Sequence, residues 1–309
     1  MPRLTRRRLL GALSLSTGAG ALSIAAREYG PFASDSEPDS DADAVAFDPA
    51  VDGFGFDNYA TPPESPSPSE FISRSDLRDR LTSVVSPPFF DLVGRSPDGA
   101  LRSGIGAIVD RFLSNADWLF GTKGYCYGMA AVAQWYAEVP TAVPVDRDST
   151  SEITQIDVPV DRSATPVRDD IERFHRSQFT DVDSWVQRLP LLRPERIDYR
   201  SQARELRAAI NKYGSAGVTI TGANVVEGHY VLLYEYDEGD TDVTFAAYDP
   251  NIAADEYATA ATSRTVGIDT AAGEPVLGSY AETFDRFLFT REDRVTNEQA
   301  RADRSERSR

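Results

Sequence analysis

Residues 229–250 read HYVLLYEYDEGDTDVTFAAYDP, and this stretch decides the fold that the sequence predicts. Two apolar runs, 229–236 and 243–248, flank an acidic segment that contains Gly239. Two such runs joined by an Asp/Gly turn are typical of a β-hairpin. A hairpin brings its two open ends together. We therefore expect His229, which opens the first strand, to lie near Asp249, which follows the second.

The hairpin belongs to a run of predicted strands that follows a run of predicted helices. Apolar residues recur at helical spacing in five segments, near 70–84, 100–114, 126–138, 166–178 and 201–213. We expect Ser201 to cap the last of these helices and Gly214 to end it. Further strands are predicted at 217–221, 265–268 and 286–289. Helices followed by antiparallel strands predict an α+β domain.

The N-terminus has the pattern of a targeting segment. Residues 5–10 read TRRRLL and open an apolar stretch that runs to residue 26. The arginine pair resembles a twin-arginine signal, which exports folded cargo. We expect residues 1–26 to be this signal peptide, and the mature protein to be extracellular or at the cell surface with no integral membrane domain. An uncleaved anchor is the alternative, although the stretch is short for a spanning helix.

Composition divides the rest of the chain into three parts. Residues 27–50 include a stretch rich in Asp, Ser, Pro and Glu and predict a disordered acidic linker. Residues 51–292 hold the predicted elements and form the expected domain. Residues 293–309 are almost all charged or polar, so we expect a disordered, solvated tail.

The charge balance of the chain is strongly acidic. Its 309 residues carry a net charge of -17 and include only two lysines, Lys123 and Lys212. Nucleic acid is excluded as a partner because phosphate binding needs a basic surface. Many carboxylates with almost no lysine are typical of a halophilic protein, in which salt screens the self-repulsion.

Cys126 is the only cysteine, so no disulfide can form within the chain. It lies in residues 124–136, GYCYGMAAVAQWY, where the glycines permit a sharp turn and the residues after Gly128 favour a helix. We therefore expect Cys126 at or just before a helix N-terminus, where unpaired N–H groups and the macrodipole stabilise a thiolate. An inert buried cysteine is the alternative.

A thiolate nucleophile needs a proton-transfer partner, and the chain has two histidines. His175 lies within a predicted helix among charged residues, and we interpret it as a surface or packing residue. His229 opens the most apolar strand, where a polar ring is expected to face a cleft. Asp249 would orient the imidazole and stabilise its charged form, with Asn251 as the rival for that role. A simple turn is the alternative reading of the Asp-Pro-Asn sequence.

Two hydrolase templates compete for this cysteine. Gly124-x-Cys126-x-Gly128 matches a nucleophile elbow, but an elbow needs a preceding strand and an acid before the histidine in chain order. Residues 111–120 favour helix and loop, and the order here is Cys, His, Asp. The chain instead resembles the papain-like cysteine peptidase superfamily. The His229 strand followed by Asp-Pro is especially similar to the peptidases that trim bacteriocin leader peptides.

This resemblance covers roughly residues 100–290 and implies a papain-like fold, with the cysteine at the start of a central helix and the other residues on an antiparallel sheet. It implies a thiol hydrolase that acts on a peptide or another amide. Cys126 would be the nucleophile, His229 the proton shuttle and Asp249 the orienting residue.

The sequence departs from the family at one position. Phe120 stands where papain-like enzymes place a Gln as oxyanion donor. Asn115, Thr122 or Lys123 could replace that Gln, or the backbone N–H of Cys126 could act alone.

No cofactor and no metal are expected. The acidic turn 237–242 lacks the ligand spacing of an EF loop, and no Cys/His cluster suits zinc. Three alternatives to a hydrolase stay open. They are a transglutaminase-type acyltransferase with the same triad, a binding module that lost turnover, and a cell-surface domain with an inert cysteine.

Overall fold

The computed structural model describes residues 45–58, 75, 124–159, 163, 165–180, 187–192, 194–223, 228–259 and 264–290. The elements below lie almost entirely in one compact unit, formed by residues 34–59, 125–184 and 190–309. The α-helices are α3 (Pro49–Asp52), α6 (Cys126–Glu138), α7 (Pro166–Thr180), α9 (Tyr199–Tyr213) and α10 (Ala254–Tyr257). Short 3-10 helices are η2 (Pro140–Ala142), η3 (Thr150–Glu152), η4 (Leu189–Leu192), η5 (Pro194–Arg196) and η6 (Gly278–Tyr280). The strands are β1 (Ala216–Thr221), β2 (His229–Glu238), β3 (Asp242–Tyr248), β4 (Thr265–Asp269), β5 (Glu274–Val276) and β6 (Arg286–Leu288).

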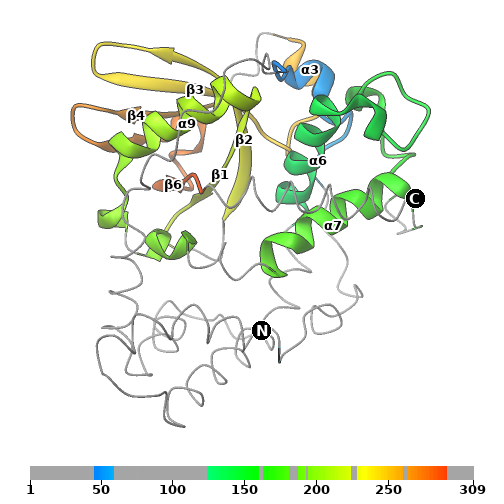
Figure 1. Ribbon diagram of the computed structural model, residues 1–309, viewed down its shortest axis with the longest axis horizontal. Helices are drawn as coiled ribbons and strands as arrows, with labels where there is room; N and C mark the ends of the chain where they lie inside the picture. Colours follow the sequence, from blue (N-terminus) through cyan, green and yellow to red (C-terminus); the bar gives the residue numbers. More distant parts are fainter. Residues whose placement is uncertain are drawn as a thin grey trace. The chain divides into compact units, whose positions relative to one another are not determined.

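The strands form one antiparallel sheet in the order β5-β4-β3-β2-β1-β6. The predicted hairpin is its centre, because β2 pairs with β3 on one side and with β1 on the other. The longer helices α6, α7 and α9 precede the sheet in the chain and flank it in space (Figure 1). The expected α+β class is therefore confirmed.

The first half of strand β2, residues 229–233, is buried on both faces, which explains its apolar run. Tyr230 and Leu232 pack with α6 in one core cluster, whereas Val231 and Leu233 pack with α9 in the other. The alternation follows from the period of two along a strand. The β2–β3 register shifts between Leu233 and Glu235. This bulge reverses the alternation further along the strand.

Helix α6 packs against α7 at a close backbone approach. A Cβ atom added at Gly128 would lie 2.2 Å from the carbonyl oxygen of Ile171. Only glycine fits at this crossing. His175 of α7 is buried beside it, and its ring meets the Tyr125 ring edge-on, with centroids 5.0 Å apart. His175 is thus a packing residue between the two helices.

The folded domain begins before the predicted boundary at residue 51. Phe47 is buried, and its ring centroid lies 5.5 Å from that of Tyr248 on β3. The Asp48 side chain caps α3 by accepting a hydrogen bond from the Ala50 N–H. Residues 45–50 therefore belong to the domain, and assigning them to the disordered linker was wrong, because the linker assignment rested on composition and Phe47 supplies a core contact.

The start of α9 also differs from the prediction. Asp198, not Ser201, is the N-cap, and its carboxylate accepts from the N–H groups of Arg200 and Ser201. Gly214 does end the helix, at φ +80°. The predicted signal peptide, the linker before residue 45, the predicted helices at 70–84 and 100–114, and the tail 293–309 lie outside the described residues. Within the described ranges, no helix is long and apolar enough to span a membrane.

Candidate active site

Cys126 is the first residue of α6. Gly124, at φ +73°, lets the chain turn sharply just before it. The first bond of the helix runs from the Met129 N–H to the Tyr125 carbonyl at 2.9 Å, so the Cys126 N–H lies ahead of it in the open first turn. The thiol is partly buried. Cys126 therefore stands at a helix N-terminus, where the backbone favours a negative charge.

His229 and Asp249 meet at one end of the central hairpin. The register pairs Leu232 of β2 with Tyr248 of β3, so the chain beyond Tyr248 runs back beside the first residues of β2. His229 Nε2 lies 2.7 Å from Asp249 Oδ1. Both side chains are buried, with His229 9% and Asp249 5% exposed. The pair is therefore a desolvated, charge-assisted contact.

Cys126 acts on the same imidazole. It helps to raise the pKa of His229, so the thiol lies close enough to the ring to affect its charge. Because Nε2 is engaged by Asp249, Nδ1 is the ring nitrogen that remains for the sulfur. The structure thus joins His229 to Asp249 and places Cys126 within electrostatic reach of His229, so the three residues that the sequence singled out form one group.

The charges of Asp249 and Cys126 favour a protonated His229 imidazole. Burial alone would lower the pKa of His229, but the hydrogen bonds to Asp249 and Cys126 and the charges of both partners raise it to about 10. Burial would likewise raise the pKa of Asp249. The hydrogen bond and charge of His229 and the Asn251 N–H outweigh it, and this pKa is lowered. At neutral pH the site therefore holds an imidazolium beside a carboxylate.

Aromatic side chains hold the Asp249 end of this group. The Asp249 backbone N–H donates to the Tyr257 hydroxyl at 2.7 Å, which fixes the carboxylate's backbone. The Phe284 ring lies nearly parallel to the imidazole, at 14° and 6.5 Å between centroids. Burial, and then the charge of Asp249, raises the pKa of Tyr280, so its hydroxyl stays protonated. His229 and Asp249 are both buried beside these rings, and burial strengthens their electrostatic contact.

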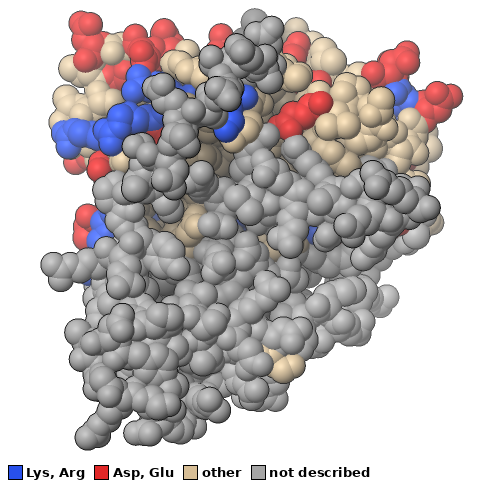
Figure 2. All heavy atoms as spheres, in the orientation of Figure 1, with Lys and Arg blue, Asp and Glu red and all other residues tan. Residues whose placement is uncertain are grey.

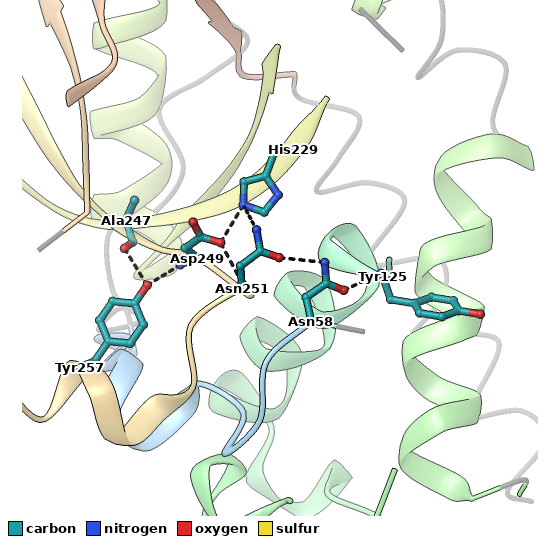
Figure 3. A network of polar contacts seen from close by, with 7 residues as sticks. All are labelled: Asn58, Tyr125, His229, Ala247, Asp249, Asn251 and Tyr257. Atoms are coloured by element: carbon teal, nitrogen blue, oxygen red, sulfur yellow. Dashed lines mark hydrogen bonds and ion pairs between the residues drawn. The ribbon is translucent and has the colours of Figure 1, made fainter. Parts of the chain in front are cut away.

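Two asparagines adjoin His229 and Asp249, namely Asn251, which the sequence offered as the rival orienting residue, and Asn58 (Figure 3). Asn251 Nδ2 lies 3.4 Å from His229 Nε2, and the Asn251 N–H donates to Asp249 Oδ1 at 2.9 Å. Asn58 Nδ2 donates to Asn251 Oδ1 at 3.0 Å, and Asn58 Oδ1 accepts from the Tyr125 N–H at 2.7 Å. Sequence reasoning missed Asn58, because nothing in the aromatic stretch 53–59 marks it as polar machinery.

Of the groups that could donate to an oxyanion, the structure describes only the backbone near Cys126. Phe120 and its suggested replacements Asn115, Thr122 and Lys123 lie outside the described residues. The Tyr125 N–H is already committed to Asn58. The Cys126 N–H is the backbone donor on the same residue as the sulfur. Its place in the open first turn of α6 suits a developing oxyanion.

A concave surface lies against α9, away from Cys126. Its lining includes Arg200, Arg204, Arg207, Glu238 and Asp242. Arginines gather in this region on the visible face, among acidic side chains (Figure 2). Arg200 donates to the carbonyls of Thr270 and Ala271, and Arg207 pairs with Glu238. These contacts tie α9 to the sheet, so we assign the groove a structural role. Among the described residues, no three His, Cys, Asp or Glu side chains gather as metal ligands.

Comparison with known proteins adds no relative. No family model, no curated protein and no solved structure matches the chain. The functional argument therefore rests on the site itself.

Proposed function

We propose that the protein is a thiol hydrolase that cleaves a peptide or another amide through Cys126, His229 and Asp249. One observation carries the proposal, namely a buried imidazole that contacts a carboxylate through Nε2 at 2.7 Å and whose pKa is also raised by a cysteine at a helix N-terminus. A nucleophile, a proton carrier and an orienting acid in one group are the parts that acyl transfer needs.

The reaction follows from the protonation states. The Cys126 thiolate attacks the amide carbonyl carbon, and the oxygen takes the negative charge beside the Cys126 N–H. As the C–N bond breaks, the His229 imidazolium gives its proton to the leaving amine, and a thioester forms. The neutral imidazole then removes a proton from water, which attacks the thioester. The acid is released, the thiolate leaves, and His229 is again protonated.

Asp249 supports both halves of this cycle. Its 2.7 Å contact holds Nε2, which leaves Nδ1 directed to the sulfur and to the leaving group. Its lowered pKa keeps it ionised at neutral pH, so it stabilises the imidazolium without taking its proton.

The order of the three residues, the helix start and the antiparallel sheet also support membership of the papain-like superfamily, as part of this proposal. The N-terminal sequence supports export by the twin-arginine pathway to the cell surface or medium. The acidic composition supports a high-salt setting.

The test is a fluorogenic peptide and amide library in molar KCl. Wild type should cleave at least one member, and Cys126→Ala should lower that rate by at least about 10³-fold, since it removes the nucleophile. His175→Gln, which removes the only other histidine, is the control and should cleave like wild type. Equal rates in wild type and Cys126→Ala would contradict the proposal.

The acyltransferase alternative uses the same residues and differs in the second step. Adding a primary amine to the assay separates the two activities by mass spectrometry. A hydrolase gives mainly the free acid, whereas a transglutaminase-type enzyme gives the amide of the added amine. A protein that binds a peptide without changing it would fit the binding-module alternative.

A further inference from the structure

Asn58 joins the two halves of the candidate site. Its Oδ1 accepts from the Tyr125 N–H at the start of the cysteine helix, and its Nδ2 donates to Asn251 Oδ1 beyond β3. Its own N–H donates to the Pro250 carbonyl at 2.7 Å. All of these polar groups of Asn58 therefore bond either the residue before Cys126 or the loop after Asp249.

The chemistry of the partners fixes which way each amide points. The oxygen and nitrogen of an amide have similar shapes, so their positions follow from what they face. The Tyr125 backbone N–H can only donate, so the Asn58 oxygen must face it. The Asn58 NH₂ group then faces Asn251, which must present its oxygen. Asn251 is left with its NH₂ group toward His229 Nε2, at 3.4 Å.

This orientation decides what Asn251 can do for the imidazole. An NH₂ group cannot accept the Nε2 proton, so it repels the protonated ring slightly. The Asp249 carboxylate, at 2.7 Å, then accepts the hydrogen bond from Nε2–H without competition. The Asn251 backbone N–H also donates to Asp249 Oδ1 and stabilises its charge. Asn251 thus acts through Asp249.

We propose that Asn58 is a positioning residue that fixes the orientation of the Asn251 amide. Asp249 is then the one side chain, of Asp249 and Asn251, that accepts the hydrogen bond from His229 Nε2–H. The role rests on the proposed function, because it matters for catalysis only if His229 carries protons for Cys126. The alternative is that Asn58 merely ties two loops together, in which case the direction of the Asn251 amide has no effect on His229.

Exchanging Asn58 for Asp separates these readings. An aspartate has the same shape but two accepting oxygens, so it can still bond the Tyr125 N–H. It can bond Asn251 only if that amide turns over and presents NH₂. The Asn251 oxygen then faces His229 Nε2 and accepts a hydrogen bond from its N–H. Removing the Asn251 amide should therefore have opposite effects on His229 in the two backgrounds.

The experiment is a double-mutant cycle read by NMR titration of the His229 ring in ¹⁵N-histidine-labelled protein. All variants carry Cys126→Ala, so that thiol ionisation and turnover do not enter, and His175→Gln assigns the two ring signals. With Asn58 present, Asn251→Ala should raise the pKa of His229. With Asn58→Asp, the same Asn251→Ala change should lower it. In the Asn58→Asp background the lost hydrogen bond corresponds to a shift of about half to one pKa unit. In the Asn58 background the shift should be smaller, because only a weak repulsion is removed.

The negative charge that Asn58→Asp introduces cancels from this comparison, because both members of the second pair carry it. Shifts of the same sign in the two backgrounds would overturn the proposal, as would no shift in either. If Asn58→Asp does not fold, Asn58→Ser is used instead. Its hydroxyl is too short to bridge both partners and frees the Asn251 amide, so Asn251→Ala should then give a smaller shift than in the Asn58 background. An equal shift overturns the proposal. The sign reversal does not require turnover, so it tests Asn58 separately from the hydrolase proposal.

Discussion

Helices α6 and α9 cover opposite faces of the same sheet, and their surroundings differ. Ten of the thirteen residues of α6 are buried, against six of the fifteen residues of α9. α6 lies between the sheet and α7, whereas α9 keeps a charged face in solvent. The two helices pack on the two faces of one sheet, and we expect them to tolerate substitution to different degrees.

The difference shows where a substitution should alter chemistry and where it should alter only stability. Residues 127–136 of α6 are all buried, and Cys126 just before them is partly exposed. The thiol therefore lies where a buried helix reaches the surface. The polar groups of α9, by contrast, bond neighbouring turns and strands. We expect effects on reactivity at the start of α6, large effects on folding within it, and small effects on the outer side of α9.

The largest expected effect comes from Asp249, beside the start of α6. Asp249→Ala leaves the His229 imidazole buried without its acceptor, which should lower Cys126-dependent cleavage by about 10²- to 10⁴-fold. The control is Asp170→Ala, which removes another buried carboxylate, on α7. It should leave the rate per folded molecule unchanged. Equal losses in the two variants would mean that Asp249 acts only through stability.

The middle of α6 should tolerate no added volume. Gly128→Val would force a side chain against the Ile171 carbonyl, and we expect a loss of about 3 kcal/mol in the free energy of unfolding. The matched change on α9 is Ala208→Val, at an exposed position, which should cost only about 0.5 kcal/mol through helix propensity. Urea titrations measure both. Similar losses at the two positions would refute the contrast between the helices.

The free energy of unfolding should depend on pH through His229 and Asp249. Because the pKa of His229 is raised from 6.5 to about 10, its contribution is complete below pH 6.5 and is lost as the pH rises toward 10. The lowered pKa of Asp249 adds stability that is present above about pH 3.8 and is lost in acid.

Urea unfolding between pH 6 and 10 measures the contribution of His229 to the free energy of unfolding. The free energy of unfolding of wild type minus that of His229→Gln should decrease across this range. The same difference for His175→Gln provides the comparison. An increase with pH for His229 would contradict the assigned charges.

The smallest expected effect lies on α9. Arg207 pairs with Glu238, and their side chains are 34% and 47% exposed. Arg207→Gln should change the free energy of unfolding by less than about 1 kcal/mol, and by less still in high salt. Arg286→Gln, which removes a buried guanidinium that donates to the Leu191 carbonyl, should cost more. The reverse order would show that the surface of α9 is less tolerant than we infer.

Much of the fold could be predicted because local patterns agree with it. The hairpin was predicted because two long apolar runs flank an acidic turn, and α6 because good helix formers follow Gly128. β5 was missed because it has only three residues, one of them Pro275. The true cap of α9 was missed because Asp198 and Ser201 are equally good caps, and only the packed structure selects where the helix begins.

The candidate site divides in the same way. Cys126, His229 and Asp249 could be predicted because rare reactive residue types stand at the ends of strong elements. Asn58 could not, because its role arises only when a segment far away in sequence comes between α6 and the loop after β3. The early start of the domain at Phe47 was missed for the same reason, since its partner is Tyr248.

The central claim is that His229 holds Cys126 in its reactive form. The most direct measurement is the rate of iodoacetamide alkylation against pH, which is unambiguous because the chain has one cysteine. We predict that wild type is alkylated faster than His229→Gln at neutral pH, since a neighbouring imidazolium favours the thiolate. Superimposable profiles for the two proteins, or a thiol that does not react while the protein is folded, would contradict the account.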